Sequence, residues 1–466
     1  MIQIIKRTRW LILFMVLAGY GQVKYSGWHY GEFSRYTDRE KNYYESWTEF
    51  LVRKNNLEAG LRFQNHTPPQ PFSLEKEGSR FSQYFVRFSN KFLKLSLGTF
   101  YGIMGRGLVF QSFENRTIRW DTNVMGGKLD WNYKKLRGSL MIGKPRDRAG
   151  NRIEMLYGGS VSGNLFRKTN LGINALTTET IDNSRQNWGS VFLEHKNKFS
   201  GIYGEIAASR NNQFPERNGH ALFLALDAYL TEITFHAEYK NYHRFALSYG
   251  SLYNYNNLPL AFKEHVFTLL NRKQHLVNGN NEAGYLFEFS GPMGEVANWL
   301  INYSRTENRQ GREMYREWYG QFEYFPSDRV ETIMAAGLEY DLEARYINLV
   351  MAPTYYINYT NSVKLQLEHQ HEKIKLTKRQ FYNQLFTLTY SNATGFSLSV
   401  VAERTTDQFS EKDMWIGGQL DVNLIKNLDL SVFGGSRREG KICVGGVCVH
   451  KPEFEGLELI INYRFH

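Results

Sequence analysis

The chain has 466 residues, a formal net charge of +11 and two cysteines, and 15% of its residues are aromatic although its mean hydropathy is −0.49. So many aromatic residues exclude a disordered chain. A large membrane β-barrel reconciles the polar average with the aromatic content, because only one face of each strand is apolar and Tyr, Trp and Phe gather at the two membrane interfaces.

The start of the chain has the pattern of an export signal. Basic residues between Lys6 and Arg9 precede a short apolar run that ends at Ala18, and small residues follow. The run is too short to cross a bilayer as a helix. We predict a signal peptide over residues 1–21 and one mature domain, an outer-membrane β-barrel, over 22–466; a buried first strand is the alternative.

Apolar and polar residues alternate along the mature chain. Residues 57–64 read Leu-Glu-Ala-Gly-Leu-Arg-Phe-Gln, and the same period of two returns at 233–239, 363–368, 396–403 and 420–424. This period predicts β-strands with one apolar face. Beyond the signal, no apolar stretch approaches the length of a membrane-spanning helix, so the chain could cross a membrane only as a closed barrel.

The connections between these segments alternate in length. Short turns such as 54–56 and 134–135 alternate with long polar stretches such as 101–122 and 240–280. Outer-membrane barrels have short periplasmic turns and long extracellular loops. If the short turns lie in the periplasm, the last strand runs toward the periplasm. Counting strands back from it then requires an additional first strand, which residues 28–36 can supply. We therefore predict an all-β fold, a single closed antiparallel transmembrane β-barrel of about 24 strands, within a range of roughly 20 to 26.

The end of the chain bears on which face of the strands is wet, because a soluble β-sandwich also alternates, with its apolar side inward. Leu457, Leu459, Ile461, Tyr463 and Phe465 form an uninterrupted alternate set before the final His466. Such an amphipathic last strand resembles the assembly signal of bacterial outer-membrane barrels. Together with the strand number and the export signal, it favours the membrane barrel over the last strand of a soluble fold.

Two cysteines, Cys443 and Cys448, flank the glycine pair Gly445 and Gly446. Export places them in an oxidising compartment, and the glycines suit a tight hairpin. We predict a disulfide in the last long loop that stabilises the fold by about 2 kcal/mol. Two thiols alone do not make a closed zinc site, which disfavours a metal role.

The segment around residues 100–123 is the least strand-like part of the chain. Gly102, Gly105 and Gly107 permit backbone conformations that other residues resist. Its polar and charged residues are candidates for the lumen or a constriction, namely Arg106, Glu114, Arg116, Arg119, Asp121 and Asn123. The segment either folds into the lumen or is an ordinary solvated surface loop, and the sequence does not decide between the two.

A second long stretch, residues 240–280, is a candidate binding loop, since long loops are often functional. Its ligand candidates are His243, Lys263, Glu264, His265 and Arg272. The alternative is that Lys263, Glu264 and Arg272 form a solvated ion-pair cluster. His369 and His371 share a strand face and could bind a metal, but no third ligand accompanies them. We therefore expect no catalytic residue, no metal and no cofactor.

Three stretches of the chain together resemble a family signature. They are Phe100-Tyr101 with Gly105-Arg106-Gly107-Leu108, Ser112 to Arg116, Asp121-x-Asn123 and Gly126-Gly127; Asn256-Asn257-x-Pro259 with Lys263-Glu264-His265 and Leu270-Asn271-Arg272; and Gly434-Gly435 with the cysteine hairpin. Their order resembles uncharacterised outer-membrane β-barrels of Bacteroidota and relatives, a domain of unknown function. Leu258 departs from that pattern, in which a second proline usually adjoins Pro259. The resemblance implies a barrel and its location, but no substrate.

The leading functional hypothesis is a channel or porin-like protein for small polar solutes. The predicted lumen face carries mixed charge that suits a wet interior, from Glu58, Arg62, His236, Glu238, Lys364, Glu368, Asp421 and Arg464. The alternative is a non-conducting structural or assembly barrel that presents surface loops to a protein or glycan partner. A barrel-embedded hydrolase is the third hypothesis, and it needs a nucleophile with an oriented base that the sequence does not reveal. Expected partners are outer-membrane lipid, small polar or anionic solutes and an outer-membrane protein, and not nucleic acid.

Overall fold

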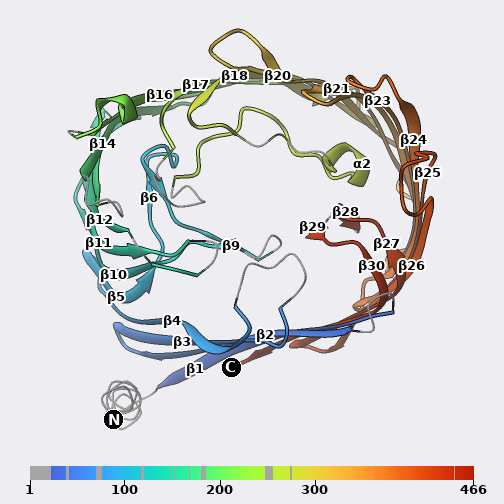
Figure 1. The fold of residues 1–466 in the computed structure, drawn as a ribbon, viewed down its shortest axis with the longest axis horizontal. Helices are drawn as coiled ribbons and strands as arrows, with labels where there is room; N and C mark the ends of the chain where they lie inside the picture. The colour runs from blue at the N-terminus through green and yellow to red at the C-terminus, as the bar shows by residue number, and fades with distance from the viewer. Residues whose placement is uncertain are drawn as a thin grey trace.

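The computed structural model describes residues 23–37, 41–69, 76–116, 120–147, 150–152, 154–166, 168–179, 185–211, 213–246, 256–272, 275, 277–444 and 447–466. Within them, one antiparallel sheet of 24 strands closes on itself into a ring (Figure 1). The predicted closed barrel and its strand number are confirmed. The predicted signal peptide over 1–21 lies outside the described residues.

The wall of the ring consists of the following strands: β1 (Lys24–Tyr36), β2 (Lys41–Lys54), β3 (Leu57–His66), β4 (Gly78–Ser89), β5 (Leu93–Phe100), β10 (Val124–Tyr133), β11 (Leu136–Pro145), β12 (Met155–Phe166), β13 (Thr169–Glu179), β14 (Arg185–Lys196), β15 (Ser200–Asn211), β16 (Gly219–Leu230), β17 (Ile233–His243), β18 (Asn281–Pro292), β19 (Ala297–Glu307), β20 (Glu313–Ser327), β21 (Val330–Asp341), β22 (Ala344–Asn358), β23 (Asn361–Ile374), β24 (Gln380–Asn392), β25 (Phe396–Thr405), β26 (Met414–Ile425), β27 (Leu428–Arg437) and β30 (Phe454–Phe465). Neighbours in this order pair with each other, so β5 pairs with β10 and β27 pairs with β30. Among the described residues, no helix is long and apolar enough to cross a bilayer.

The ring closes where the first and last strands meet. β1 pairs with β2 on one side and with β30 on the other, so that Gly27 lies opposite Phe465 and Trp28 opposite Arg464. A Cβ atom on Gly27 would lie 2.4 Å from the Phe465 ring. The last aromatic side chain of the chain therefore packs where only glycine leaves room for it. The first strand predicted at 28–36 belongs to β1, which begins at Lys24.

The strands alternate between an apolar outer face and an inner face that is largely polar. On β24, Tyr382, Phe386 and Leu388 are exposed on the outer face, whereas Asn383 and Thr387 on the inner face are buried. The same alternation on β15 exposes Ile202 and Ile206 and buries Glu205. An apolar outer face is what a barrel in a lipid bilayer requires. The buried inner face means that other parts of the chain cover it.

Three long connections provide that cover, and we call them the inward segments. The first, residues 101–123, holds β6 (Ile103–Met104), β7 (Phe110–Gln111), β8 (Glu114–Asn115) and β9 (Trp120–Asp121); the second, residues 244–280, holds α2 (Thr268–Asn271); the third, residues 438–453, holds β28 (Gly440–Val444) and β29 (Val447–Lys451). Figure 1 shows β6, β9, α2, β28 and β29 inside the ring. All three leave from the rim opposite the first and last described residues, which we call the long-loop rim. The other rim carries the short turns, and the first and last described residues lie there.

The hydrophobic core lies inside the ring, between the inward segments and the wall. The largest cluster joins Leu108, Val109 and Phe110 of the first inward segment to Phe245 and Leu258 of the second, and to inner wall residues such as Trp188, Tyr203 and Phe223. In a smaller cluster, Phe267 and Leu270 of the second segment pack on Tyr319, Ala335 and Val350 of the wall. A fully buried side chain of this size stabilises by roughly 1.5–3 kcal/mol, so apolar packing holds these segments in the lumen.

Candidate functional site

The first inward segment touches the wall at Gly105 and Arg106. Gly105 has φ = 59°, in the left-handed region, and a Cβ atom there would lie 2.3 Å from Oε2 of Glu205 on β15. The backbone N–H of Arg106 donates to the same oxygen at 3.2 Å. The Arg106 guanidinium lies over the ring of Tyr203, 4.2 Å from its centroid. The predicted lumen residue Arg106 is thus inside the ring. The residue before it is glycine because the backbone is left-handed there and Glu205 leaves no room for a Cβ atom.

Glu205 is fully buried and its carboxylate is satisfied entirely by protein groups. It accepts from Ser190 Oγ at 2.6 Å, from the Tyr203 hydroxyl at 2.6 Å and from Asn174 Nδ2 at 3.3 Å, besides the Arg106 N–H. A buried charge is costly unless it is hydrogen-bonded in this way. The network therefore fixes the turn of the first inward segment against β15.

The same segment meets a second part of the wall, β1 to β3, through Glu114 and Arg116. Arg62 of β3 donates to Glu114 at 2.7 Å and to Glu49 of β2 at 2.6 Å, and only 4% of Arg62 is exposed. Arg116 lies over the Trp28 ring of β1, 3.7 Å from its centroid. Arg116 also donates to Glu114 at 2.9 Å, so Glu114 links Arg116 of the segment to the predicted lumen residue Arg62 of the wall.

Asp121 and Asn123 form the third attachment of this segment. Asp121 accepts from the Tyr101 hydroxyl at 2.9 Å, from Gln83 at 3.0 Å and from Arg146 at 3.3 Å. Burial, reinforced by the Asp121 charge, raises the pKa of Tyr101 well above its usual value, so its hydroxyl stays a donor. Arg119, also predicted for the lumen, lies outside the described residues.

The loop between β11 and β12 also contacts Asn123. Arg152 donates to the backbone oxygen of Asn123 at 2.9 Å and also contacts its side chain. Burial and the nearby Arg146 charge lower the pKa of Arg152 to about 10. Arg152 therefore keeps its charge at neutral pH and remains a donor to the segment.

In the second inward segment, the short helix α2 begins on a wall carboxylate. Glu368 of β23 accepts the backbone N–H groups of Thr268 at 3.1 Å and Leu269 at 2.7 Å. Gln366 donates to Glu368 at 2.6 Å, and Gln370 donates to the Leu269 oxygen at 2.9 Å. Helix N-termini leave such N–H groups without partners within the helix, and here the barrel wall supplies the acceptors.

The predicted ligand residues of this segment are paired with the wall or with another inward segment. Lys263 Nζ lies 2.6 Å from Glu288 on β18, and His265 Nε2 lies 2.8 Å from Glu317 on β20. Arg272 forms two contacts with Glu403 of β25, one of them at 2.7 Å. Glu264 pairs with Lys441 of the third inward segment at 3.0 Å and is more than half exposed. The ion pairs of Lys263, Glu264 and Arg272 are therefore not with one another.

His243, the fifth predicted ligand residue, lies apart from the other four. It is at the end of β17 on the outward side, because its strand neighbours Lys240 and Tyr242 point inward and are buried. Its ring centroid lies 5.2 Å from that of His220 on the adjacent strand. Four of the five loop candidates thus have partners on the wall or on another inward segment, whereas this histidine lies on the outward side of its strand.

The third inward segment shares a wall carboxylate with the second. Arg438 donates to Glu403 at 3.3 Å and to Asn383 at 2.9 Å, so Glu403 receives both Arg438 and Arg272. Glu403 is 5% exposed. We call these three residues the Glu403 junction. At the other end of the segment, Lys451 pairs with Glu458 at 2.9 Å and with Glu32 at 3.3 Å.

The cysteine hairpin belongs to this third segment. Cys443 and Cys448 are direct cross-strand partners in the β28–β29 pairing, as the predicted tight hairpin requires. The side chains of residues 442–450 lie outside the described part of the structure. The disulfide therefore stays a prediction.

Sequence reasoning missed the wall carboxylates that hold the inward segments, namely Glu205, Glu317 and Glu403, and assigned Glu368 only to the lumen face. Their signal is present in the sequence, because each is an acidic residue at an inward position of an alternating strand. What the alternation cannot reveal is the partner, since Glu368 and the α2 backbone are separated by about 100 residues in the chain.

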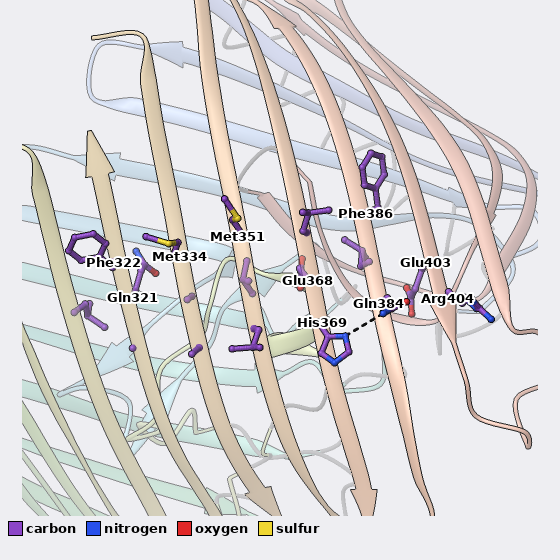
Figure 2. Close-up of a pocket in the computed structure, with 18 of the residues that line it drawn as sticks. Gln321, Phe322, Met334, Met351, Glu368, His369, Gln384, Phe386, Glu403 and Arg404 are labelled. Carbon is purple, nitrogen blue, oxygen red and sulfur yellow. Dashed lines mark hydrogen bonds between the residues drawn. The ribbon is translucent and has the colours of Figure 1, made fainter. Parts of the chain in front are cut away.

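A hollow of about 960 Å³ crosses β19 to β26 and is lined mainly by side chains of the outer face. Figure 2 shows Phe322, Met334, Met351 and Phe386 on it, with His369 and Gln384 joined by a hydrogen bond of 3.5 Å. His369 and His371 are outward-facing and lie beside the Tyr382 ring. No group of three His, Cys, Asp or Glu side chains that could hold a metal occurs among the described residues.

The comparisons with known proteins agree with this architecture. The model of a family of unknown function (DUF6029) matches residues 31–298 and 303–465. This supports the family part of the resemblance, and the Bacteroidota origin stays a prediction. Comparison with curated proteins finds no match.

Solved structures of the P pilus usher have a similar fold. The P pilus usher (PapC) translocation pore is 11% identical, with 95% of this chain and 100% of that chain covered and a TM-score of 0.53. A PapC-PapD-PapK-PapG tip assembly intermediate of the E. coli P pilus is 10% identical, with 95% of this chain and 60% of that chain covered and a TM-score of 0.57. The Pseudomonas aeruginosa outer-membrane protein OpdK is 8% identical, with 95% of this chain and 98% of that chain covered and a TM-score of 0.41. At these identities the likeness concerns the fold alone.

Proposed function

The chain belongs to the family of unknown function DUF6029, and from that premise and the geometry of its lumen we propose that it is an outer-membrane channel for small polar solutes, narrowed by its three inward segments. The proposal includes export by a signal peptide over residues 1–21, with the short-turn rim in the periplasm. N-terminal sequencing of the mature protein tests the cleavage site near Gln22.

The proposal rests on a wide ring in which charged wall residues bind the inward segments, which enter the ring from the long-loop rim. A ring of 24 strands is wide enough for an aqueous interior unless something fills it. Glu205, Glu368 and Glu403 each bind a segment through hydrogen bonds or ion pairs. Segments that are attached to the wall at a few points narrow the lumen and so act as a constriction.

The lumen near the short-turn rim keeps a wet, mixed-charge lining. His236 of β17 pairs with Asp227 at 2.6 Å and with Glu238 at 3.3 Å, and each of these three side chains is between one fifth and one third exposed. Lys128 and Asp130 form another such pair at 2.9 Å on β10. Charges of both signs on a hydrated wall favour polar solutes over apolar ones.

The structural neighbours add support of a general kind. The P pilus usher is described as a translocation pore, and its ring is similar to this one. Because the identity is 11%, the neighbour supports a channel-like barrel and suggests no particular solute.

Liposome swelling tests the proposal. The purified mature protein is reconstituted into liposomes, which are diluted into isotonic solutions of uncharged sugars of increasing size. We expect swelling in small sugars that falls off as the sugar grows, because the inward segments narrow the lumen. Swelling no faster than in protein-free liposomes would contradict the proposal.

A second candidate function is a sealed barrel that presents its long loops to a surface protein or glycan. The complete burial of Glu205, Glu282 and Glu317 favours it, since those inner positions are closed to water. Mild detergent extraction followed by affinity purification distinguishes the two functions: a stable partner together with an absence of swelling would favour the sealed barrel.

A further inference from the structure

The short-turn rim has an uneven distribution of charge. Four consecutive turns along it, between β4 and β5, β10 and β11, β12 and β13, and β14 and β15, contain or adjoin lysines and no acidic residue lies within them. The lysines are Lys91, Lys134, Lys135, Lys168, Lys196 and Lys198. The next two turns carry an acidic residue and no base, namely Glu232 and Glu295, and the turn after them holds both Asp328 and Arg329.

These six lysines lie on or beside turns between neighbouring strands, and we call them the basic arc. The strands that carry them are neighbours in the wall, because β5 pairs with β10 and each later strand pairs with the next. Figure 1 shows these strands along one side of the ring. All six lysines are exposed. In the described part of the chain, only Lys196 has an ion pair, with Glu194 at 2.6 Å, so protein groups leave most of this charge unneutralised.

Large exposed aromatic side chains accompany the lysines. Phe92, Tyr133, Phe166 and Phe199 are each more than half exposed. Lys91, Lys134 and Lys198 lie between 5.2 and 5.7 Å from the ring centroids of their sequence neighbours Phe92, Tyr133 and Phe199. Aromatic rings beside cations at the edge of an apolar belt are typical of a protein surface that meets lipid headgroups.

We propose that the basic arc binds anionic phospholipid headgroups of the leaflet that the short-turn rim meets, an inference that rests on the membrane placement proposed above. The aromatic rings lie at the edge of the apolar outer wall and enter the interface, while the lysines pair with headgroup phosphates. A soluble acidic partner would account for the lysines, but it would not require an exposed ring beside them at the membrane edge. The difference in charge between the four basic turns and the three turns that follow them makes the lipid preference one-sided around the barrel.

The test measures lipid association with the mature protein in bilayers, using spin-labelled phosphatidylglycerol and phosphatidylcholine at low and high salt. We expect phosphatidylglycerol to associate on the order of two- to five-fold more strongly at low salt, and the preference to shrink as salt screens the lysines. The variant K91Q/K134Q/K135Q/K168Q/K198Q should lose the preference. The matched variant with arginine at the same five positions should keep it, and K375Q/K378Q/K412Q on the long-loop rim should leave it unchanged.

Heat-modifiable migration on gels verifies that each variant is a folded barrel. Equal association of the two lipids with the unaltered protein overturns the proposal, as does a preference that survives the glutamine variant. A preference lost equally in the long-loop variant also overturns it, because the charge would then act without regard to place. Conductance and swelling are read separately, so the lipid proposal and the channel proposal fail independently.

Discussion

At the scale of single residues, the lumen is organised by carboxylates that point inward from the wall. Alternation in the sequence is enough to predict that Glu368 faces the lumen, and the buried inner face of β23 agrees. The roles of Glu368 and Glu403 could not be predicted, because each contacts residues about 100 or more positions away. Local pattern shows which way a side chain points, whereas its partner depends on how distant segments pack.

Gly105 offers a sharp test of the contact between the first inward segment and the wall. Gly105 and Gly294 both have positive φ, but a Cβ atom would meet Glu205 only at Gly105, and nothing lies within 4 Å of the corresponding position at Gly294. We expect Gly294→Ala to cost about 1–2 kcal/mol for the left-handed backbone. Gly105→Ala should cost more, because the buried carboxylate must also move.

Urea unfolding followed by heat-modifiable gel migration measures both glycine variants. Equal free energies of unfolding for Gly105→Ala and Gly294→Ala would contradict the tight contact of the first segment with β15.

The Glu403 junction supplies a second residue-scale prediction. Glu403→Gln leaves Arg272 and Arg438 facing a neutral amide, and removing one partner of a buried ion pair costs about 3–5 kcal/mol. Glu264→Gln is the matched control, because Glu264 is more than half exposed in its pair with Lys441 and exposed pairs contribute about 0–1 kcal/mol. Limited proteolysis should cleave the second inward segment faster in Glu403→Gln alone. The same cleavage rate in both variants would show that the junction does not hold the segment.

At the scale of elements, the strands were predictable and the inward segments were not. The period of two predicts strands because successive side chains on a strand point to opposite faces, and 57–64 lies within β3 as expected. The segment 101–123 could have been a surface loop or a lumen segment, since glycine and charge suit both. Its apolar triplet Leu108, Val109 and Phe110 decides the matter, because all three are fully buried against the wall.

The hairpin of β28 and β29 carries an element-scale prediction. Cys443 and Cys448 are cross-strand partners, and we expect them to form a disulfide in the exported protein. Alkylation with iodoacetamide, read by mass spectrometry, should modify neither cysteine unless a reductant is added first. Replacing both by serine should lower the free energy of unfolding by roughly 2 kcal/mol. Two alkylated cysteines without reductant would contradict the disulfide.

At the scale of the whole molecule, alternation, strand parity and the amphipathic last strand together predicted a closed barrel of the observed size. They could do so because a sheet with one apolar face has to close on itself to satisfy its backbone groups in lipid. These sequence patterns could not predict the filled lumen, since it depends on packing between segments far apart in the chain. The outer wall and the lumen therefore differ in how far the sequence alone explains them.

Single-channel recording in planar bilayers measures whether this membrane barrel conducts ions through a lumen narrowed by its inward segments. We expect small stepwise currents for the unaltered protein and larger steps for Glu403→Gln, with Glu264→Gln behaving as the unaltered protein. An absence of stepwise current from all three proteins, at every salt concentration, would contradict a conducting lumen.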